Sequence, residues 1–118
     1  MITVCFNESA DERHGRLAVS GHAGADVRGR DVICAAVSAI AQTLALYLCY
    51  LHETVAPFDT LIVTEGQNPF VVEYRVMMNN GALPRVKAAV DAAVMGLGVI
   101  ANQHPQHVQF INDPAGSV

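Results

Sequence analysis

The sequence predicts an α+β fold in one domain over residues 1–118, a sandwich in which a mostly antiparallel sheet packs with two helices. Three observations support this class. Short segments alternate apolar and polar residues with the period of strands, and two longer segments repeat apolar residues with the period of helices. Each predicted helix follows a predicted strand hairpin, so the order is β-β-α-β-β-α-β, which favours a sandwich over a doubly wound sheet. A chain of 118 residues is long enough to bury one core.

The first two strands are expected to form a hairpin. Residues 2–7 alternate between apolar and polar side chains, as a half-buried strand does. Residues 8–15 are mostly polar and end in glycine, which indicates the loop. Residues 16–21 alternate again, so a second strand should pair antiparallel with the first. His22 would then lie at the end of that second strand.

The first helix is expected to run from Val32 to about His52. Asp31 is a good N-cap, because its carboxylate can accept hydrogen bonds from backbone N–H groups two or three residues ahead. This assignment places Cys34 in the first turn. The helix is apolar nearly all round, which predicts that more than one of its faces is buried. In so small a domain, contact with another subunit is one way to bury the second apolar face of the helix.

The same apolar run is almost long enough to cross a bilayer, which takes about 20 mainly apolar residues. However, Ser38, Gln42 and Thr43 lie near its middle, and no cation flanks it beyond Arg28 and Arg30. A buried core helix is therefore favoured over a membrane span.

The second half of the chain repeats the layout of hairpin and helix. Strands are expected over residues 59–64 and 70–77, joined by a short segment rich in turn formers. Pro84 suits the first turn of the second helix, and apolar residues recur at helical spacing over residues 86–100. A short last strand is expected over residues 108–111.

The charge of the chain argues against nucleic acid as a direct partner. The net charge is −4, the pI is about 5.6, and the seven Lys and Arg residues are scattered, whereas phosphate binding needs clustered cations. The three cysteines have no paired spacing, and the first residues lack the pattern of a secretory signal. We therefore expect reduced thiols and a cytoplasmic protein.

Residues 21–34 concentrate the reactive chemistry of the chain. They combine His22, three glycines, four charged residues and Cys34. A thiol is a useful nucleophile when its thiolate is stabilised, and a helix N-terminus and a nearby imidazolium both do this. Free N–H groups at the helix start, together with the glycine-rich backbone, would suit an oxyanion. We therefore expect Cys34 and His22 to form a catalytic pair, with His22 as the general base and acid.

Simpler interpretations of these residues stay open. A lone cysteine in an apolar helix is most often a core residue, and the other two cysteines of the chain have the surroundings of structural ones. Asp31 either caps the helix or orients His22. Ser38, one turn beyond Cys34, either donates a hydrogen bond in the site or bonds back to the preceding turn. Arg28 and Arg30 of the loop either contact an acidic substrate or only keep the loop solvated.

Two other kinds of site are disfavoured. His104 and His107 have no second cluster of ligands at the spacing of a structural zinc site, so no metal or other cofactor is expected. The glycine-rich loop precedes a helix start, as phosphate-binding loops do. It matches neither a Walker A loop nor a dinucleotide-binding fingerprint, and it lacks the lysine of the former.

One motif covers the reactive segment. It consists of Gly21-His22-Ala23 and, after a loop, of Gly29-x-Asp31-Val32-Ile33-Cys34-Ala35-Ala36-Val37-Ser38-Ala39. This motif closely resembles the signature of the bacterial ribosomal-processing cysteine proteases, the Prp family. The later segments 96–101 and 105–111 also resemble the C-terminal part of that family, mainly in pattern.

The resemblance implies a small α+β homodimer whose cysteine–histidine pair falls on Cys34 and His22. Gly21, Asp31 and Ser38 coincide with positions of the family motif, as residues that support the site or bind substrate. Prp-like proteins remove a short N-terminal extension from the twenty-seventh protein of the large ribosomal subunit. The expected activity is therefore that of a cysteine endopeptidase, with a ribosomal protein precursor as its peptide substrate. The family's loop between histidine and cysteine is expected to move as substrate enters.

Two alternatives to the protease are kept. One is a non-enzymatic, dimeric, ribosome-associated binding module that uses the loop as a docking surface. The other is a general hydrolase of small amides or thioesters. An activated thiol at Cys34 would separate either enzyme from the binding module, because only the enzymes need a nucleophile.

Overall fold

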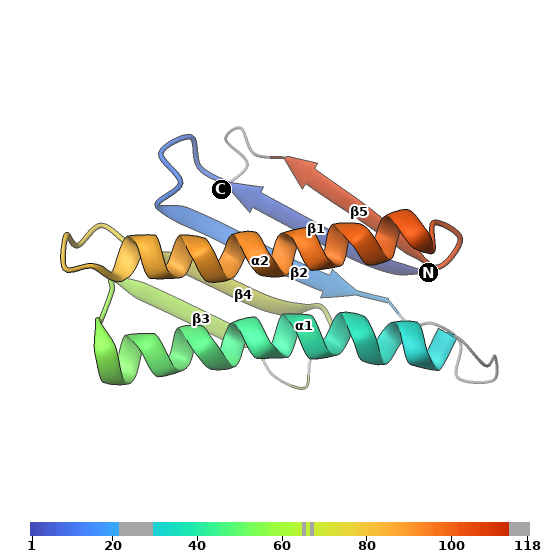
Figure 1. Ribbon diagram of the computed structural model, residues 1–118, viewed down its shortest axis with the longest axis horizontal. Coiled ribbons are helices and arrows are strands. Elements are labelled where there is room, and N and C mark those ends of the chain that lie inside the picture. Colours follow the sequence, from blue (N-terminus) through green and yellow to red (C-terminus); the bar gives the residue numbers. More distant parts are fainter. Residues whose placement is uncertain (22–29, 65, 67, 114–118) are drawn as a thin grey trace.

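The computed structural model describes residues 1–21, 30–64, 66 and 68–113, which contain a five-stranded sheet and two long helices. Figure 1 shows the helices lying across one face of the sheet. This arrangement confirms the predicted α+β sandwich and its element order. The elements are β1 (Ile2–Glu8), β2 (His14–Ser20), α1 (Arg30–Tyr50), a short π-helical turn (Leu51–Val55), β3 (Thr60–Thr64), β4 (Phe70–Arg75), α2 (Ala82–Gln103) and β5 (Val108–Asp113).

The sheet is mostly antiparallel, as predicted. Its strand order is β3-β4-β2-β1-β5. The pairs β1–β2, β2–β4 and β3–β4 are antiparallel, whereas β1 and β5 run parallel because α2 carries the chain back across the sheet. The pairing of β2 with β4 brings the two hairpins together, with Val19 opposite Phe70. As a result, the turn between β3 and β4 lies beside the end of β2.

The core lies between the sheet and the helices. Alternate residues of the strands face the helices, as the period of two requires, and each helix turns one apolar stripe toward them. The two helices also touch, and a side chain at Gly96 of α2 would press on Ile40 of α1. Buried members of this core include Ile2, Val4, Phe6, Leu17, Val37, Leu44, Leu48, Val72, Tyr74, Val86, Val90, Leu97 and Val108.

The prediction for the start of α1 was wrong by two residues. The helix begins at Arg30, so Asp31 is its second residue and not its N-cap. Arginine propagates a helix well, and an aspartate inside the first turn is favourable beside the positive end of the helix dipole. The shift makes Cys34 the fifth helical residue, at the start of the second turn, where sequence reasoning placed it in the first.

The end of α1 also differs from the expectation. The predicted exit after His52 is instead a π-helical turn that continues to Val55. The backbone N–H of Phe58 donates to Nδ1 of His52, and the two rings lie in contact. This contact turns the chain toward β3.

The second hairpin and helix lie where they were predicted, although β4 ends at Arg75 and the prediction ended at residue 77. β3 and β4 pair across the predicted turn, and Pro84 lies in the first turn of α2. The side-chain oxygen of Asn80 accepts a hydrogen bond from the N–H of Ala82 at the helix start. The last strand extends two residues beyond the predicted end at 111.

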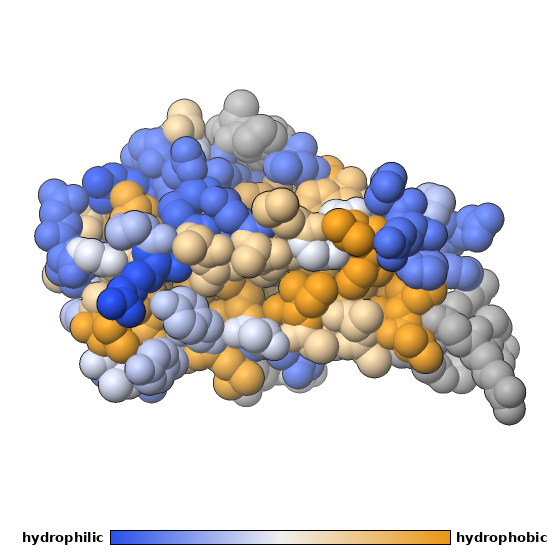
Figure 2. Space-filling view, viewed as in Figure 1, coloured by the Kyte–Doolittle hydropathy of each residue, from blue (hydrophilic) through white to orange (hydrophobic). Residues whose placement is uncertain are grey.

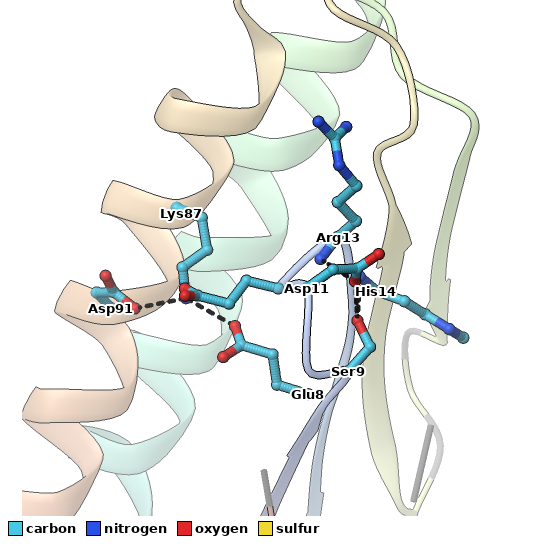
Figure 3. Close-up of polar contacts among 8 residues, drawn as sticks. Glu8, Ser9, Asp11, Arg13, His14, Lys87 and Asp91 are labelled. Atoms are coloured by element: carbon cyan, nitrogen blue, oxygen red, sulfur yellow. Dashed lines mark hydrogen bonds and ion pairs between the residues drawn. The ribbon is translucent and has the colours of Figure 1, made fainter. Parts of the chain in front are cut away.

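The turn between β1 and β2 is tied to itself and to α2, at the opposite end of β2 from residue 21 (Figure 3). The carboxylate of Asp11 accepts from the Ser9 hydroxyl and the Arg13 N–H, and these bonds hold the pKa of Asp11 below its usual value. Lys87 of α2 reaches the Glu8 carboxylate at 2.7 Å. This ion pair fixes α2 over the hairpin.

The segment Val32–Val55 is long and apolar enough to cross a membrane by length and composition alone, a test that core helices of soluble proteins also pass. In this fold, Ile33, Val37 and Leu48 of the segment are buried in the core. Val32 and Leu46 of the same segment are exposed, at 71% and 69%.

Candidate active site

Cys34 lies at the edge of a cleft near the start of α1. Its side chain is partly buried and packs against the core. The cleft has a volume of about 230 Å³. The thiol is therefore supported by core packing on one side and reachable by a ligand on the other, as a nucleophilic side chain requires.

Three parts of the fold form the walls of this cleft. The first is one face of α1, the second is the pair of ends of β1 and β2, and the third is the turn between β3 and β4. Their lining residues are Cys34, Val37, Ser38, Ala41 and Gln42 from α1, Ile2, Val19 and Gly21 from β1 and the end of β2, and Gly66 and Asn68 from the turn with Phe70 at the start of β4.

Two of the predicted supporting residues share this cleft with Cys34. Ser38 lies one helical turn beyond Cys34 on the same face of α1, and it is half-buried. Gly21 borders the cleft from the end of β2. The structure thus brings Gly21, at the end of β2, to the same cleft as Cys34 and Ser38 of α1.

The backbone at Gly21 is held on two sides. Its φ of +88° lies in the left-handed region, and a Cβ at this position would overlap the carbonyl oxygen of Met1. Only glycine fits such a conformation and such a close approach. The N–H of Gly21 also donates to Oδ1 of Asn68 at 3.2 Å. The strand end that leads into His22 therefore passes close to the Met1 backbone and is hydrogen-bonded to the β3–β4 turn.

The remaining predicted site residues are not placed. His22 lies outside the described residues, as do Arg28 and the rest of the loop up to residue 29. Asp31 is described only as part of the α1 backbone. The pairing of His22 with Cys34 thus remains a prediction.

Sequence reasoning missed the third wall of the cleft. Gly66 and Asn68 belong to the predicted turn, and Phe70 begins the predicted strand over residues 70–77. None of them was given a role in the site. The signal needed to place them is the pairing of β2 with β4. That contact is distant in the chain, so no local pattern predicts it. Gln42 was noted only as a polar residue in the apolar helix, and it completes the α1 wall.

The other two cysteines lie away from this cleft. Cys5 is on β1 at a position that alternates with the core residues, and its thiol donates weakly to the Asn7 side chain at 3.7 Å. Cys49 is partly buried near the opposite end of α1. Within the described part of the chain, no group of three His, Cys, Asp or Glu side chains is arranged to hold a metal ion.

Comparison with known proteins supports the same class of activity. A family model described as cysteine protease Prp matches residues 1–109. None of the curated proteins matches the chain.

Several solved structures share the fold. A ribosomal processing protease Prp from S. aureus, in complex with a substrate peptide, has a TM-score of 0.71 and 16% identity, with 96% of this chain and 100% of that chain covered. The same enzyme with a covalently linked product peptide has a TM-score of 0.69 and 17% identity, again with 96% of this chain and 100% of that chain covered. SMU.848 from Streptococcus mutans has a TM-score of 0.65 and 24% identity, with 98% of this chain and 96% of that chain covered.

Proposed function

The chain belongs to the cysteine protease Prp family, and from that premise we propose that it removes an N-terminal extension from a large-subunit ribosomal protein. The observation that carries the proposal is the position of Cys34, a partly buried thiol that opens into a cleft walled by three elements. Cys34 is the nucleophile and His22 is the acid and base.

The proposed reaction has two steps. The Cys34 thiolate attacks the carbonyl carbon of the scissile peptide bond and forms a C–S bond, and the C–N bond then breaks as His22 gives its proton to the leaving amine. In the second step water attacks the thioester, His22 takes a proton from that water, and the sulfur leaves as thiolate. The products are a new carboxylate and the mature N-terminus.

Because α1 starts at Arg30, the helix dipole contributes less to stabilising the Cys34 thiolate than a start at Val32 would imply. The influence of a helix dipole falls off within the first turn, and Cys34 lies at the start of the second. A larger share of the stabilisation therefore falls to the His22 imidazolium. The oxyanion is expected to bind near the helix start, where backbone N–H groups lack helical partners.

Supporting roles follow from position and from the family motif. The Ser38 hydroxyl borders the cleft one turn from the thiol, which supports a hydrogen bond to substrate over a purely local bond. Gly21 fixes the strand end before His22. Asp31 does not precede the helix, so its place in the motif favours orienting His22 over capping.

We also propose that the protein is a homodimer that forms through the outer face of its two helices. Figure 2 shows apolar residues gathered on this face. Two adjoining hollows run along it, of about 470 and 530 Å³. We call this surface the helix outer face, and its exposed or half-buried residues include Ala39, Thr43, Tyr47, Ala88, Ala89 and Ala92. Contiguous apolar surface of this kind is typical of protein interfaces.

A cytoplasmic location fits the substrate, because ribosomal proteins are synthesised there. The binding-module alternative predicts an ordinary thiol in the same cleft. Alkylation by iodoacetamide near neutral pH separates the two, with mass mapping of the modified cysteine. The protease predicts that Cys34 reacts faster than free cysteine, and a rate no faster than free cysteine would favour the binding module.

A further inference from the structure

A second hollow lies beside the Cys34 cleft, further along α1. It has a volume of about 300 Å³ and is lined by Gln42, Ala45, Leu46, Gly66 and Phe70. Three of these residues, Gln42, Gly66 and Phe70, also line the Cys34 cleft. The two hollows therefore share a boundary and form one continuous groove between α1 and the β3–β4 turn, which we call the α1 groove.

The floor of the α1 groove has a regular spacing. Cys34, Ser38, Gln42 and Leu46 follow one another at intervals of four residues, so each lies beside the next in a row that winds around the helix by about 40° per step. With a rise of about 1.5 Å per residue, Leu46 lies about 18 Å along the helix from Cys34. An extended peptide rises about 3.3 Å per residue. The groove beyond the thiol thus matches about five residues of extended chain.

The chemistry of the groove changes along its length. Nearest the thiol, Ser38 and Gln42 offer a hydroxyl and an amide, which can bond to the peptide groups of an extended chain. Further along, Leu46 is 69% exposed and stands with Ala45 and the half-buried Phe70 around the second hollow. Exposed apolar surface next to a polar track suits a peptide that ends in an apolar side chain.

We propose that the substrate on one side of the scissile bond lies extended in the α1 groove. Gln42 bonds to its main chain, and Leu46 with Phe70 holds an apolar side chain about five residues from the scissile bond. This inference rests on the proposed function, since it takes Cys34 as the point of cleavage. The occupant is an unfolded peptide segment, and recognition extends well beyond the cleaved bond.

Binding to the Cys34→Ala variant tests the groove without turnover. The probes are fluorescent peptides from the junction of the organism's own ribosomal protein precursor, cut back in turn on each side to about two residues from the scissile bond. We expect cutting back one particular side to weaken binding about tenfold, as loss of a buried apolar side chain does. Equal affinity of all these peptides would overturn the proposal.

Substitutions on α1 locate the contact. Leu46→Glu is expected to remove the tenfold advantage of the longer peptide and to leave the affinity of the shorter one unchanged. Tyr50→Glu is the matched control, because Tyr50 is an exposed residue one turn further along α1 that lines neither hollow. Equal effects of both variants on peptide affinity would contradict the groove. Dissociation of a dimer by Leu46→Glu with unchanged peptide affinity would assign the surface to a second copy and overturn the proposal.

The protease activity and the peptide groove can be refuted separately. A protein with Cys34 intact that binds the long peptide through Leu46 without cleaving it would refute the protease and keep the groove. Cleavage that is insensitive to Leu46→Glu and to peptide length would keep the protease and refute the groove.

Discussion

The side chain of Asn68 accepts a hydrogen bond from the backbone N–H of Gly21, at 3.2 Å, across two elements distant in the chain. Gly21 is the residue before His22, and Asn68 borders the same cleft as Cys34. The β3–β4 turn therefore does more than close a hairpin: it holds the strand end that delivers the proposed acid and base.

Asn68→Ala is expected to lower kcat by about tenfold or more, because small displacements of a catalytic group are costly. The fold should survive, since both partners of this hydrogen bond are exposed. The measurement is kcat and KM on the precursor peptide. Asn80→Ala is the control: it removes two side-chain hydrogen bonds, one to Ala82 at the start of α2 and one to Pro57, and Asn80 does not line the cleft. A smaller effect of Asn68→Ala than of Asn80→Ala on kcat would count against a positioning role.

Gly21→Ala is expected to destabilise the fold by more than Gly66→Ala. Both glycines have positive φ, at +88° and +67°, so each substitution incurs backbone strain of about 1 kcal/mol. Only at Gly21 does the added Cβ also overlap a backbone atom, the carbonyl oxygen of Met1, whereas the position at Gly66 is open. Urea unfolding of both variants compares them directly, and equal losses would show that the contact with Met1 is unimportant.

The fold is expected to lose stability above about pH 10. Burial raises the pKa of Tyr74, helped by the nearby Glu8 carboxylate. Burial alone would lower the pKa of Lys87, but hydrogen bonds to Glu8, Glu12 and Asp91 outweigh it and raise that pKa. The folded state thus keeps protons that the unfolded chain releases, so this stability is complete below the unfolded pKa values and falls as pH rises through the folded ones.

Tyr74→Phe separates the two contributions. The Tyr74 hydroxyl is buried without a hydrogen-bond partner among the described residues, so its removal should be neutral or stabilising by about 1 kcal/mol near neutral pH. The alkaline fall of Tm should become shallower and persist in part through Lys87. An unchanged alkaline slope in this variant would show that Tyr74 does not contribute.

Ala92→Arg is expected to convert the proposed dimer into monomers, because it places a charge on the helix outer face. Ala92 is exposed and lines the hollow of about 470 Å³ there, so the isolated fold should tolerate the change. Sedimentation gives the mass. Ile62→Arg is the control, since Ile62 is an exposed apolar residue on β3. Dissociation by Ile62→Arg and not by Ala92→Arg would move the interface to β3.

The elements of this fold were predictable because their signals are local. Alternation of apolar residues over residues 2–7 and helical spacing over residues 86–100 each reflect which face of one element meets the core. The start of α1 was misplaced because Asp31 suits both an N-cap and a first turn. The choice between these depends on the residues before it.

The site was only half predictable for a different reason. Cys34 and Ser38 share one helix, so their common face follows from spacing alone. Asn68 and Phe70 join them only through the pairing of β2 with β4, and a non-local strand pairing leaves no mark in a short sequence window. The third wall of the cleft was therefore found only from the structure.

The most direct test of the central claim is the intact mass of the ribosomal protein precursor after incubation with the purified protein. We expect the unmodified chain to remove the N-terminal extension. The Cys34→Ala variant should leave the precursor whole, while Cys5→Ser and Cys49→Ser should process it, because those thiols lie away from the cleft. Complete processing by Cys34→Ala would contradict the assignment of Cys34 as the nucleophile.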